Sequence, residues 1–237
     1  MIAACLLNGQ SSIGSCLFFA LVLAGLCLSA QSSRGKEHTG RLKTGTAVAI
    51  SPTGLFLTNF HVIDGCLTIT LWLPGHDGIS ARVLKVDDTS DIALLAADTT
   101  GPVSSLMLAS KEARSGDRVS MLAFAADPRN PRMPTIVNGT IVGMKRISNG
   151  RSVLVVNAPL NPGASGGAVV DKQHRIVGLI FGRLRNRVSR AVAVPISALR
   201  QFVGKDDAVS TESVDERRGG KKMVELLNAG SALIQCS

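Results

Sequence analysis

The chain has 237 residues, a formal net charge of +9, and 45% hydrophobic but only 3% aromatic residues. Basic charge alone would allow nucleic-acid binding, but no recognition motif accompanies it, so no nucleic-acid partner is expected. The chain contains no Walker or dinucleotide glycine motif and no Cys/His cluster with metal-ligand spacing. We therefore expect neither a cofactor nor a metal.

The N-terminal segment is apolar. Residues 17–30 form a continuous apolar run that ends in small residues suited to cleavage before Gln31. This pattern predicts a secretory signal peptide over residues 1–30, followed by a linker over residues 31–41. An uncleaved membrane anchor is the alternative, because no Lys or Arg precedes Arg34 and ~18 apolar residues are just enough to cross a bilayer.

Short apolar segments rich in β-branched residues follow, separated by Pro, Gly, Asn and Asp. Such spacing predicts an all-β barrel or sandwich. The expected strands are 45–50, 55–60, 67–73, 81–86, 92–96, 118–125, 135–145, 152–157, 168–171, 176–182 and 191–195. One short closing helix is expected over residues 196–203. About 165 residues can bury one or two modest cores.

One serine lies in the small-residue segment 161–167, Asn-Pro-Gly-Ala-Ser-Gly-Gly. Glycines let the backbone bend sharply and offer N–H groups unobstructed by side chains, which suits an oxyanion hole. A nucleophilic serine also needs a histidine base and a carboxylate that orients the base. The motif alone does not identify the fold, because Gly163 to Gly167 also fits the G-x-S-x-G elbow of α/β hydrolases.

The order of the three residue types separates the alternatives. An α/β hydrolase needs its acid and histidine after the serine, where the only histidine is His174 in a polar stretch. A subtilisin-type order needs an aspartate before the histidine, but Glu37 is the only acid before His61. The order histidine, aspartate, serine remains, and His61, Asp91 and Ser165 supply it.

Each residue of this set also has a structural interpretation. His61 follows the apolar segment 55–60 and could simply cap a strand. Asp91 leads the apolar run 92–96 and could be a turn residue or a partly buried acceptor for an imidazole N–H. The rival acids Asp87 and Asp88 lie in a stretch typical of an exposed turn, so we rank them below Asp91.

Four segments together resemble trypsin-like serine proteases of the HtrA/Deg type. They are residues 45–62, 91–95, 161–168 and 176–179. The resemblance covers residues 42–203 and implies an all-β chymotrypsin-type fold of two six-stranded antiparallel β-barrels with a short C-terminal helix. It implies a serine endopeptidase whose triad lies between the barrels and works through an acyl-enzyme. The N–H groups of Gly163 and Ser165 would form the oxyanion hole.

Protein or peptide substrates follow from this resemblance. Residues Ile180, Phe181 and Gly182 resemble the strand that pairs with an extended peptide. Leu160 resembles a wall of the primary specificity pocket. Because no acidic residue occurs between Arg151 and Ser165, we expect small or medium apolar side chains at the cleaved position. Plain core packing is the alternative role for Leu160 and Phe181.

The chain departs from the family pattern at three points. Ala164 stands where HtrA-type proteases usually have Asn and digestive proteases have Asp, so the oxyanion loop must be ordered in some other way. Residues 204–237 are predicted to be a charged tail, with a linker over 205–222 and a small helix over 223–234, and are too short for a PDZ domain. The scarcity of aromatic residues leaves open whether a homo-oligomer forms. These departures keep a second function open, a catalytically silent peptide-binding module with the protease fold.

The resemblance favours export to an extracytoplasmic location, periplasmic or secreted. A retained leader would instead associate the protein with a membrane, and the positive-inside rule would then keep the domain in the cytoplasm. Outside the leader the cysteines are Cys66 and Cys236. They could pair in an oxidising compartment, but two cysteines are too few to define a disulfide pattern typical of a known fold.

Overall fold

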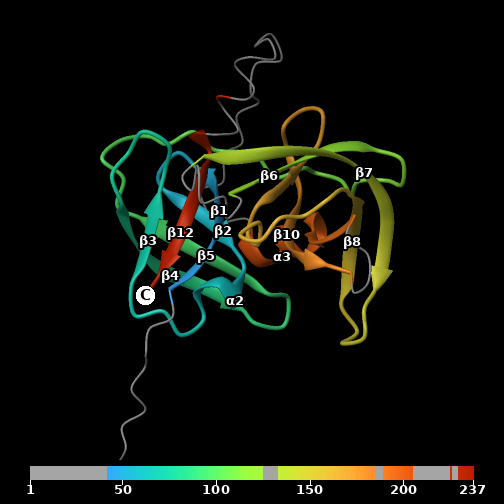
Figure 1. Ribbon diagram of the computed structural model, residues 1–237, viewed down its shortest axis with the longest axis horizontal. Coiled ribbons are helices and arrows are strands. Elements are labelled where there is room, and N and C mark those ends of the chain that lie inside the picture. Colours follow the sequence, from blue (N-terminus) through green and yellow to red (C-terminus); the bar gives the residue numbers. More distant parts are fainter. Residues whose placement is uncertain (1–41, 125–132, 185–188, 205–224, 226–228) are drawn as a thin grey trace, which may run out of the picture. The chain divides into compact units, whose positions relative to one another are not determined.

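The computed structural model describes residues 42–124, 133–184, 189–204, 225 and 229–237. Within these residues the chain forms two closed six-stranded barrels, and every pairing between neighbouring strands is antiparallel. Figure 1 shows the first barrel in blue to green with one red strand, and the second in green to orange. The expected fold class is confirmed.

The first barrel closes in the order β1-β12-β3-β4-β5-β2. Its strands are β1 (Lys43–Ser51), β2 (Leu55–Thr58), β3 (Ile69–Trp72), β4 (Ile79–Asp87), β5 (Ile92–Ala97) and β12 (Ser231–Cys236). Large apolar side chains from separate strands, including Phe56, Leu71, Leu95 and Ile234, are fully buried in its core. Five strands therefore come from one stretch of chain, and the sixth comes from far along the sequence.

That sixth strand, β12, corrects the prediction for the tail. It lies between β1 and β3, and Ile234 is paired with Gly45 on one side and Leu71 on the other. Glu225 and Ala229 are helical, as the predicted helix over 223–234 requires, but the chain turns at Gly230 and continues as a strand. A strand forms because partners on both sides satisfy its backbone while its apolar side chains enter the core. The predicted linker over 205–222 lies outside the described residues.

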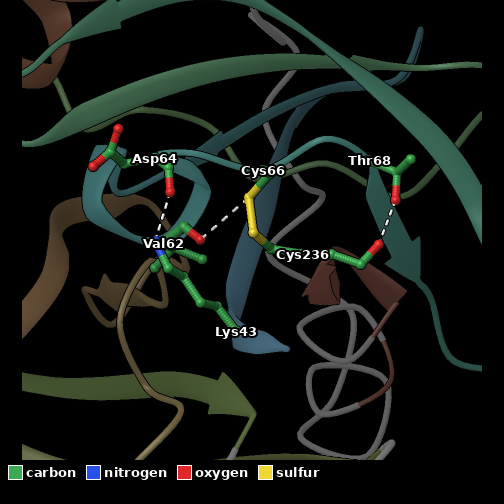
Figure 2. Close-up of a disulfide and its surroundings, with 7 residues drawn as sticks. Lys43, Val62, Asp64, Cys66, Thr68 and Cys236 are labelled. Carbon is green, nitrogen blue, oxygen red and sulfur yellow. Dashed lines mark hydrogen bonds between the residues drawn. A yellow bond between two sulfur atoms is a disulfide. The ribbon is translucent and has the colours of Figure 1, made fainter. Parts of the chain in front are cut away.

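A disulfide between Cys66 and Cys236 holds β12 to the rest of the first barrel (Figure 2). It joins positions 170 residues apart, with a distance of 5.3 Å between the Cα atoms. The main chain of Ser237 adds to this attachment, because its carbonyl oxygen accepts the N–H groups of Leu67 at 2.7 Å and Thr68 at 2.9 Å. The question that the sequence left open is thus answered: the two cysteines pair.

The second barrel is built from one stretch of chain and closes in the order β10-β11-β8-β7-β6-β9. Its strands are β6 (Arg118–Phe124), β7 (Pro134–Arg146), β8 (Ser152–Asn157), β9 (Ala168–Val170), β10 (Ile176–Arg183) and β11 (Arg190–Pro195). Helix α3 (Ile196–Val203) follows at the predicted bounds and buries Leu199 and Phe202. Lys85 of β4 donates to the Phe202 carbonyl, which links α3 to the first barrel.

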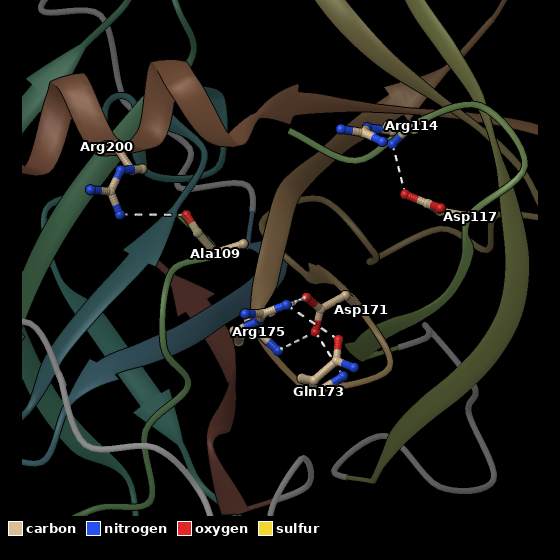
Figure 3. Close-up of polar contacts among 7 residues, drawn as sticks. All are labelled: Ala109, Arg114, Asp117, Asp171, Gln173, Arg175 and Arg200. Atoms are coloured by element: carbon tan, nitrogen blue, oxygen red, sulfur yellow. Dashed lines mark hydrogen bonds and ion pairs between the residues drawn. The ribbon is translucent and has the colours of Figure 1, made fainter. Parts of the chain in front are cut away.

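The tight turn between β9 and β10 is held by the carboxylate of Asp171 (Figure 3). This carboxylate accepts the N–H groups of Gln173 and Arg175, each at 2.9 Å, and forms an ion pair with the Arg175 guanidinium. His174 in this turn has a φ of 61° and is half-buried. The turn sets the register between β9, which follows the serine loop, and β10, which contains the expected peptide-binding segment.

Candidate active site

His61 lies on a short helix, α2 (Phe60–Ile63), and not at the end of a strand. Strand β2 ends at Thr58, two residues before the predicted end. The chain turns into a helix here because Val62 and Ile63 then enter the core of the first barrel. The His61 side chain remains 49% exposed, so its imidazole is accessible from solvent.

The Asp91 carboxylate contacts His61 through both of its oxygens. Its Oδ2 lies 2.7 Å from His61 Nδ1, and its Oδ1 accepts the main-chain N–H of His61 at 2.9 Å. Two contacts from one carboxylate hold both the position and the rotation of the imidazole ring. Because Nδ1 faces Asp91, the Nε2 edge of the ring is left to face a reacting group.

Asp91 adopts an unusual backbone conformation that Asn59 supports. Its φ is 60°, in the left-handed region, which costs a residue other than glycine about 1–3 kcal/mol. The Asn59 side chain is fully buried and donates its Nδ2–H to the Asp91 carbonyl oxygen at 2.9 Å. Sequence reasoning missed Asn59. The available signal was an amide side chain directly after an apolar strand and two residues before the histidine.

The rival acids serve the turn between β4 and β5 instead. Asp87 accepts the N–H of Ser90 at 2.9 Å. The hydrogen bond from the Ser90 side chain holds the pKa of Asp87 below its usual range, partly opposed by burial of the carboxyl. Asp88 is exposed. Of the three candidate carboxylates, the structure brings Asp91 to the histidine.

The loop that carries Ser165 is held by strands from both barrels. Gly166 N–H donates to the Ile180 carbonyl of β10 at 2.8 Å, and the Ser165 carbonyl accepts Thr46 N–H of β1, also at 2.8 Å. Gly166 has a φ of 85°, and a Cβ added there would collide with the Thr46 carbonyl oxygen. Glycine at this position is therefore required both by the conformation and by the close approach of β1.

The serine loop and helix α2 lie on either side of Gly45. A Cβ added to Gly45 would clash with the Val62 side chain of α2 and would lie 3.2 Å from the Ser165 carbonyl oxygen. This glycine thus lets the segment with His61 and the segment with Ser165 approach each other. Three residues that are far apart in sequence converge on one region, with His61 and Asp91 in direct contact.

The expected oxyanion donors differ from the neighbouring N–H groups of the serine loop. Within the described residues, the N–H groups of Gly163 and Ser165 donate to no protein atom, whereas those of Ala164, Gly166 and Gly167 do. Ala164 is buried and its methyl side chain offers no hydrogen bond to the loop. The two free N–H groups are therefore available to a ligand, and the loop is ordered through its main chain.

The expected substrate contacts fall into two groups. Leu160 and Phe181 are half-buried and pack against the core, as the structural alternative predicted, while Ile180 is fully buried. Ile180 N–H also donates to Gly167, so the start of this segment is tied to the serine loop. Beyond it, β9 has no residue opposite Phe181 or Gly182, and β10 has a bulge there. Among the described residues, this edge of β10 therefore has no partner strand beyond Ile180.

The described part of the chain contains no group of three or more His, Cys, Asp or Glu residues that could hold a metal ion. No helix in that part is long and apolar enough to cross a membrane. The predicted leader, residues 1–30, and linker, residues 31–41, lie outside the described residues.

Two closed antiparallel barrels, with a histidine–aspartate pair on one and a glycine-flanked serine loop on the other, define the chymotrypsin-like class of fold. The trypsin-like peptidase domain family matches residues 45–179, more than half of the chain. The chain belongs to this family.

Several proteins are similar to the chain in sequence. It is 28% identical over 165 residues to the uncharacterized protein y4bJ of Sinorhizobium fredii, covering 69% of this chain and 26% of that protein. It is 27% identical over 174 residues to a probable periplasmic serine endoprotease, DegP-like, of Rickettsia conorii, covering 67% of this chain and 33% of that protein. The chain thus spans a quarter to a third of the length of these relatives.

A solved structure of an HtrA-type protease, AlgW with a decapeptide, has a similar fold. The TM-score is 0.59 and the identity 27%, and the match covers 67% of this chain and 50% of that one. The resemblance to HtrA-type proteases drawn from the sequence motifs therefore extends to the three-dimensional fold.

Proposed function

We propose that the protein is a serine endopeptidase that cleaves peptide bonds through an acyl-enzyme, with His61, Asp91 and Ser165 as its triad. The observation that carries this proposal is the 2.7 Å contact between His61 Nδ1 and Asp91 Oδ2, beside a glycine-flanked serine loop. Membership of the trypsin-like peptidase family supports it, as do the protease names of similar proteins.

In the proposed reaction, Ser165 Oγ attacks the substrate carbonyl carbon while His61 Nε2 takes the hydroxyl proton. His61 then gives that proton to the leaving amine, and a water molecule hydrolyses the acyl-enzyme by the reverse route. Asp91 stabilises the imidazolium form and holds its orientation. The N–H groups of Gly163 and Ser165 receive the oxyanion, each contributing ~3 kcal/mol to transition-state stabilisation.

The proposed substrate is an extended peptide that adds a strand to the edge of β10 beyond Ile180. An added strand gains affinity through main-chain hydrogen bonds, which suits sequence-tolerant binding. A Cβ added to Gly182 would meet its nearest described atom at 4.0 Å, so the face of β10 is not crowded there. The peptide named in the AlgW structure supports this class of substrate. Small or medium apolar residues are proposed at the cleaved position, beside Leu160.

An extracytoplasmic location is part of the proposal. A disulfide persists in oxidising compartments and is rare in the cytosol, so the Cys66–Cys236 bond supports export. The periplasmic designation of the Rickettsia relative points the same way.

Replacing Ser165 with Ala tests the proposal. Peptide turnover should fall about a million-fold in kcat, and labelling by a fluorophosphonate should be abolished. Ser110→Ala is a matched control outside the proposed site and should label normally. Turnover by Ser165→Ala near the wild-type rate, in a preparation free of other proteases, would contradict the assignment. A wild-type protein that binds peptides but neither labels nor cleaves would support the silent peptide-binding module.

A further inference from the structure

We propose that Thr46 is a positioning residue that orients the oxyanion loop through its side-chain hydroxyl. Thr46 lies on β1 in the first barrel, whereas the loop belongs to the second barrel. The inference rests on the proposed function, because it concerns the same serine. It supplies the ordering that the apolar side chain of Ala164 cannot provide.

Every polar group of Thr46 is used, although the residue is fully buried. Its N–H donates to the Ser165 carbonyl at 2.8 Å, and its carbonyl accepts the Thr58 hydroxyl at 2.8 Å. Its Oγ1 lies 3.0 Å from the Gly163 carbonyl oxygen and 3.0 Å from the Phe124 nitrogen. Thr46 therefore contacts the carbonyl groups of Gly163 and Ser165, which lie before and after the Ala164–Ser165 peptide.

The direction of the hydroxyl is determined by its two partners. Phe124 N–H can only donate, so it uses a lone pair of Thr46 Oγ1. The Gly163 carbonyl can only accept, so it must receive the hydroxyl hydrogen. The resulting chain runs from Phe124 N–H through the Thr46 hydroxyl to the Gly163 carbonyl. Phe124 and Thr46 are fully buried, so water does not replace these bonds cheaply.

These bonds fix the peptide plane on each side of the Ala164–Ser165 peptide. A peptide group is planar and trans, so its carbonyl and the following N–H point in opposite directions. The Gly163 carbonyl is bound by the Thr46 hydroxyl, and the Ser165 carbonyl is bound by the Thr46 N–H. Thr46 thus holds the peptide before and the peptide after the one that carries the Ser165 N–H.

The central peptide is then left with one orientation. The Ala164 carbonyl accepts Gly167 N–H at 3.0 Å, and the Ser165 N–H on the opposite side of the same plane has no acceptor among the described residues. Without the Thr46 hydroxyl, the Gly163–Ala164 peptide would keep only the long bond from Ala164 N–H to the Asn161 carbonyl, at 3.4 Å, and could rotate. The Gly163 and Ser165 N–H groups belong to the peptides on either side of it, so this rotation would displace both oxyanion donors.

The test compares Thr46→Val, which keeps the shape but lacks the hydroxyl, with Thr46→Ser, which keeps the hydroxyl. Thr135→Val is the control, because the Thr135 hydroxyl also donates to a main-chain carbonyl, that of Ala123 at 3.1 Å, and lies in the second barrel, which carries the serine loop. For each full-length variant, kcat and KM for a peptide substrate, the fluorophosphonate labelling rate and the thermal unfolding midpoint are measured.

Removing one oxyanion donor lowers kcat about 100- to 1,000-fold in related chemistry, so misdirecting the donors in part of the population should lower it about 10- to 100-fold. For Thr46→Val we expect this fall in kcat, a KM within about 3-fold of wild type, and a matching fall in the labelling rate. Thr46→Ser should restore kcat to within about 3-fold. Thr135→Val, at an exposed position, should leave kcat unchanged.

Equal kcat values for Thr46→Val and Thr135→Val, with an active wild type, would overturn this inference and leave the proposed function intact. If Thr46→Val does not fold, Thr46→Ala replaces it in the comparison. Loss of folding in both variants, with Thr46→Ser folded and active, would assign Thr46 to folding and also overturn the inference. A wild-type protein that neither cleaves nor labels would overturn the proposed function itself, and this inference with it.

Discussion

The two barrels carry different parts of the proposed site and are built in different ways. The second barrel uses one continuous stretch, residues 118–195, and contributes the serine loop. The first barrel combines residues 43–97 with the distant strand 231–236, and contributes His61 and Asp91. Closing a loop of more than 100 residues costs conformational entropy before any contact compensates for it. The barrel that carries the histidine–aspartate pair therefore closes only with a remote strand, whereas the barrel that carries the serine loop closes without one.

The two halves also differ in what holds their functional groups. His61 and Asp91 are held mainly by side chains, their own and that of Asn59. The serine loop is held through its main chain, by β1 on one side and β10 on the other. Substitutions of single side chains should therefore lower kcat more in the histidine–aspartate half than in the serine half. Thr46 is the exception.

Among substitutions in the histidine–aspartate half, the largest effect should come from Asp91→Asn. An asparagine keeps the shape but favours the wrong imidazole tautomer, so kcat should fall about 10,000-fold. Asp88→Asn, in the neighbouring exposed turn, should change kcat less than about 2-fold. Steady-state kinetics on one peptide substrate would measure both. Similar losses in the two variants would show that the carboxylate acts through the turn and not through His61.

Removing the disulfide tests the dependence of the first barrel on β12. Cys66→Ser combined with Cys236→Ser should lower the free energy of unfolding by about 4 kcal/mol, because the bond closes a very long loop. Urea unfolding under oxidising conditions would measure the change. Reducing agent should destabilise the wild type but leave the double variant unaffected. Equal unfolding midpoints for the wild type and the double variant, each with and without reducing agent, would mean that strand pairing alone holds β12.

Equivalent cavities in the two barrels should accelerate hydrogen exchange in different regions of the protein. Ile234→Ala in β12 and Leu154→Ala in β8 each remove a fully buried side chain and should cost about 3 kcal/mol. In Ile234→Ala, hydrogen exchange should accelerate first in β12 and in the strand edges that it covers, because this strand can detach locally. In Leu154→Ala, exchange should accelerate throughout the second barrel together. Identical exchange patterns would mean that both barrels unfold as one unit.

The smallest effect should come from Asn59→Ala. It leaves the Asp91 carbonyl without its donor at a strained backbone position and should cost about 1–2 kcal/mol of stability. Asp91 should then hold the imidazole less firmly, and kcat should fall about 10-fold. Asn59→Asp, which replaces the amide donor with a buried carboxylate, should destabilise the protein more than Asn59→Ala does. An Asn59→Ala protein with unchanged kcat but reduced stability would limit Asn59 to a structural role.

The sequence predicted those elements whose pattern is local. The helix over 196–203 was predicted at its observed bounds, and the strands of the second barrel within one or two residues, because alternating and continuous apolar runs record which faces are buried. β12 was missed because a six-residue segment with few strong strand formers becomes a strand only when β1 and β3 supply partners on both sides.

By itself, the sequence determined the order of histidine, aspartate and serine, the glycines around Ser165 and the all-β class, since each follows from residue type and spacing. Only the tertiary structure decided that Asp91 faces His61, that Cys66 reaches Cys236, and that Thr46 and Asn59 hold the site. The physical reason is that local patterning encodes burial along one segment. Contacts between segments arise only when the closed barrels bring those segments within hydrogen-bonding distance.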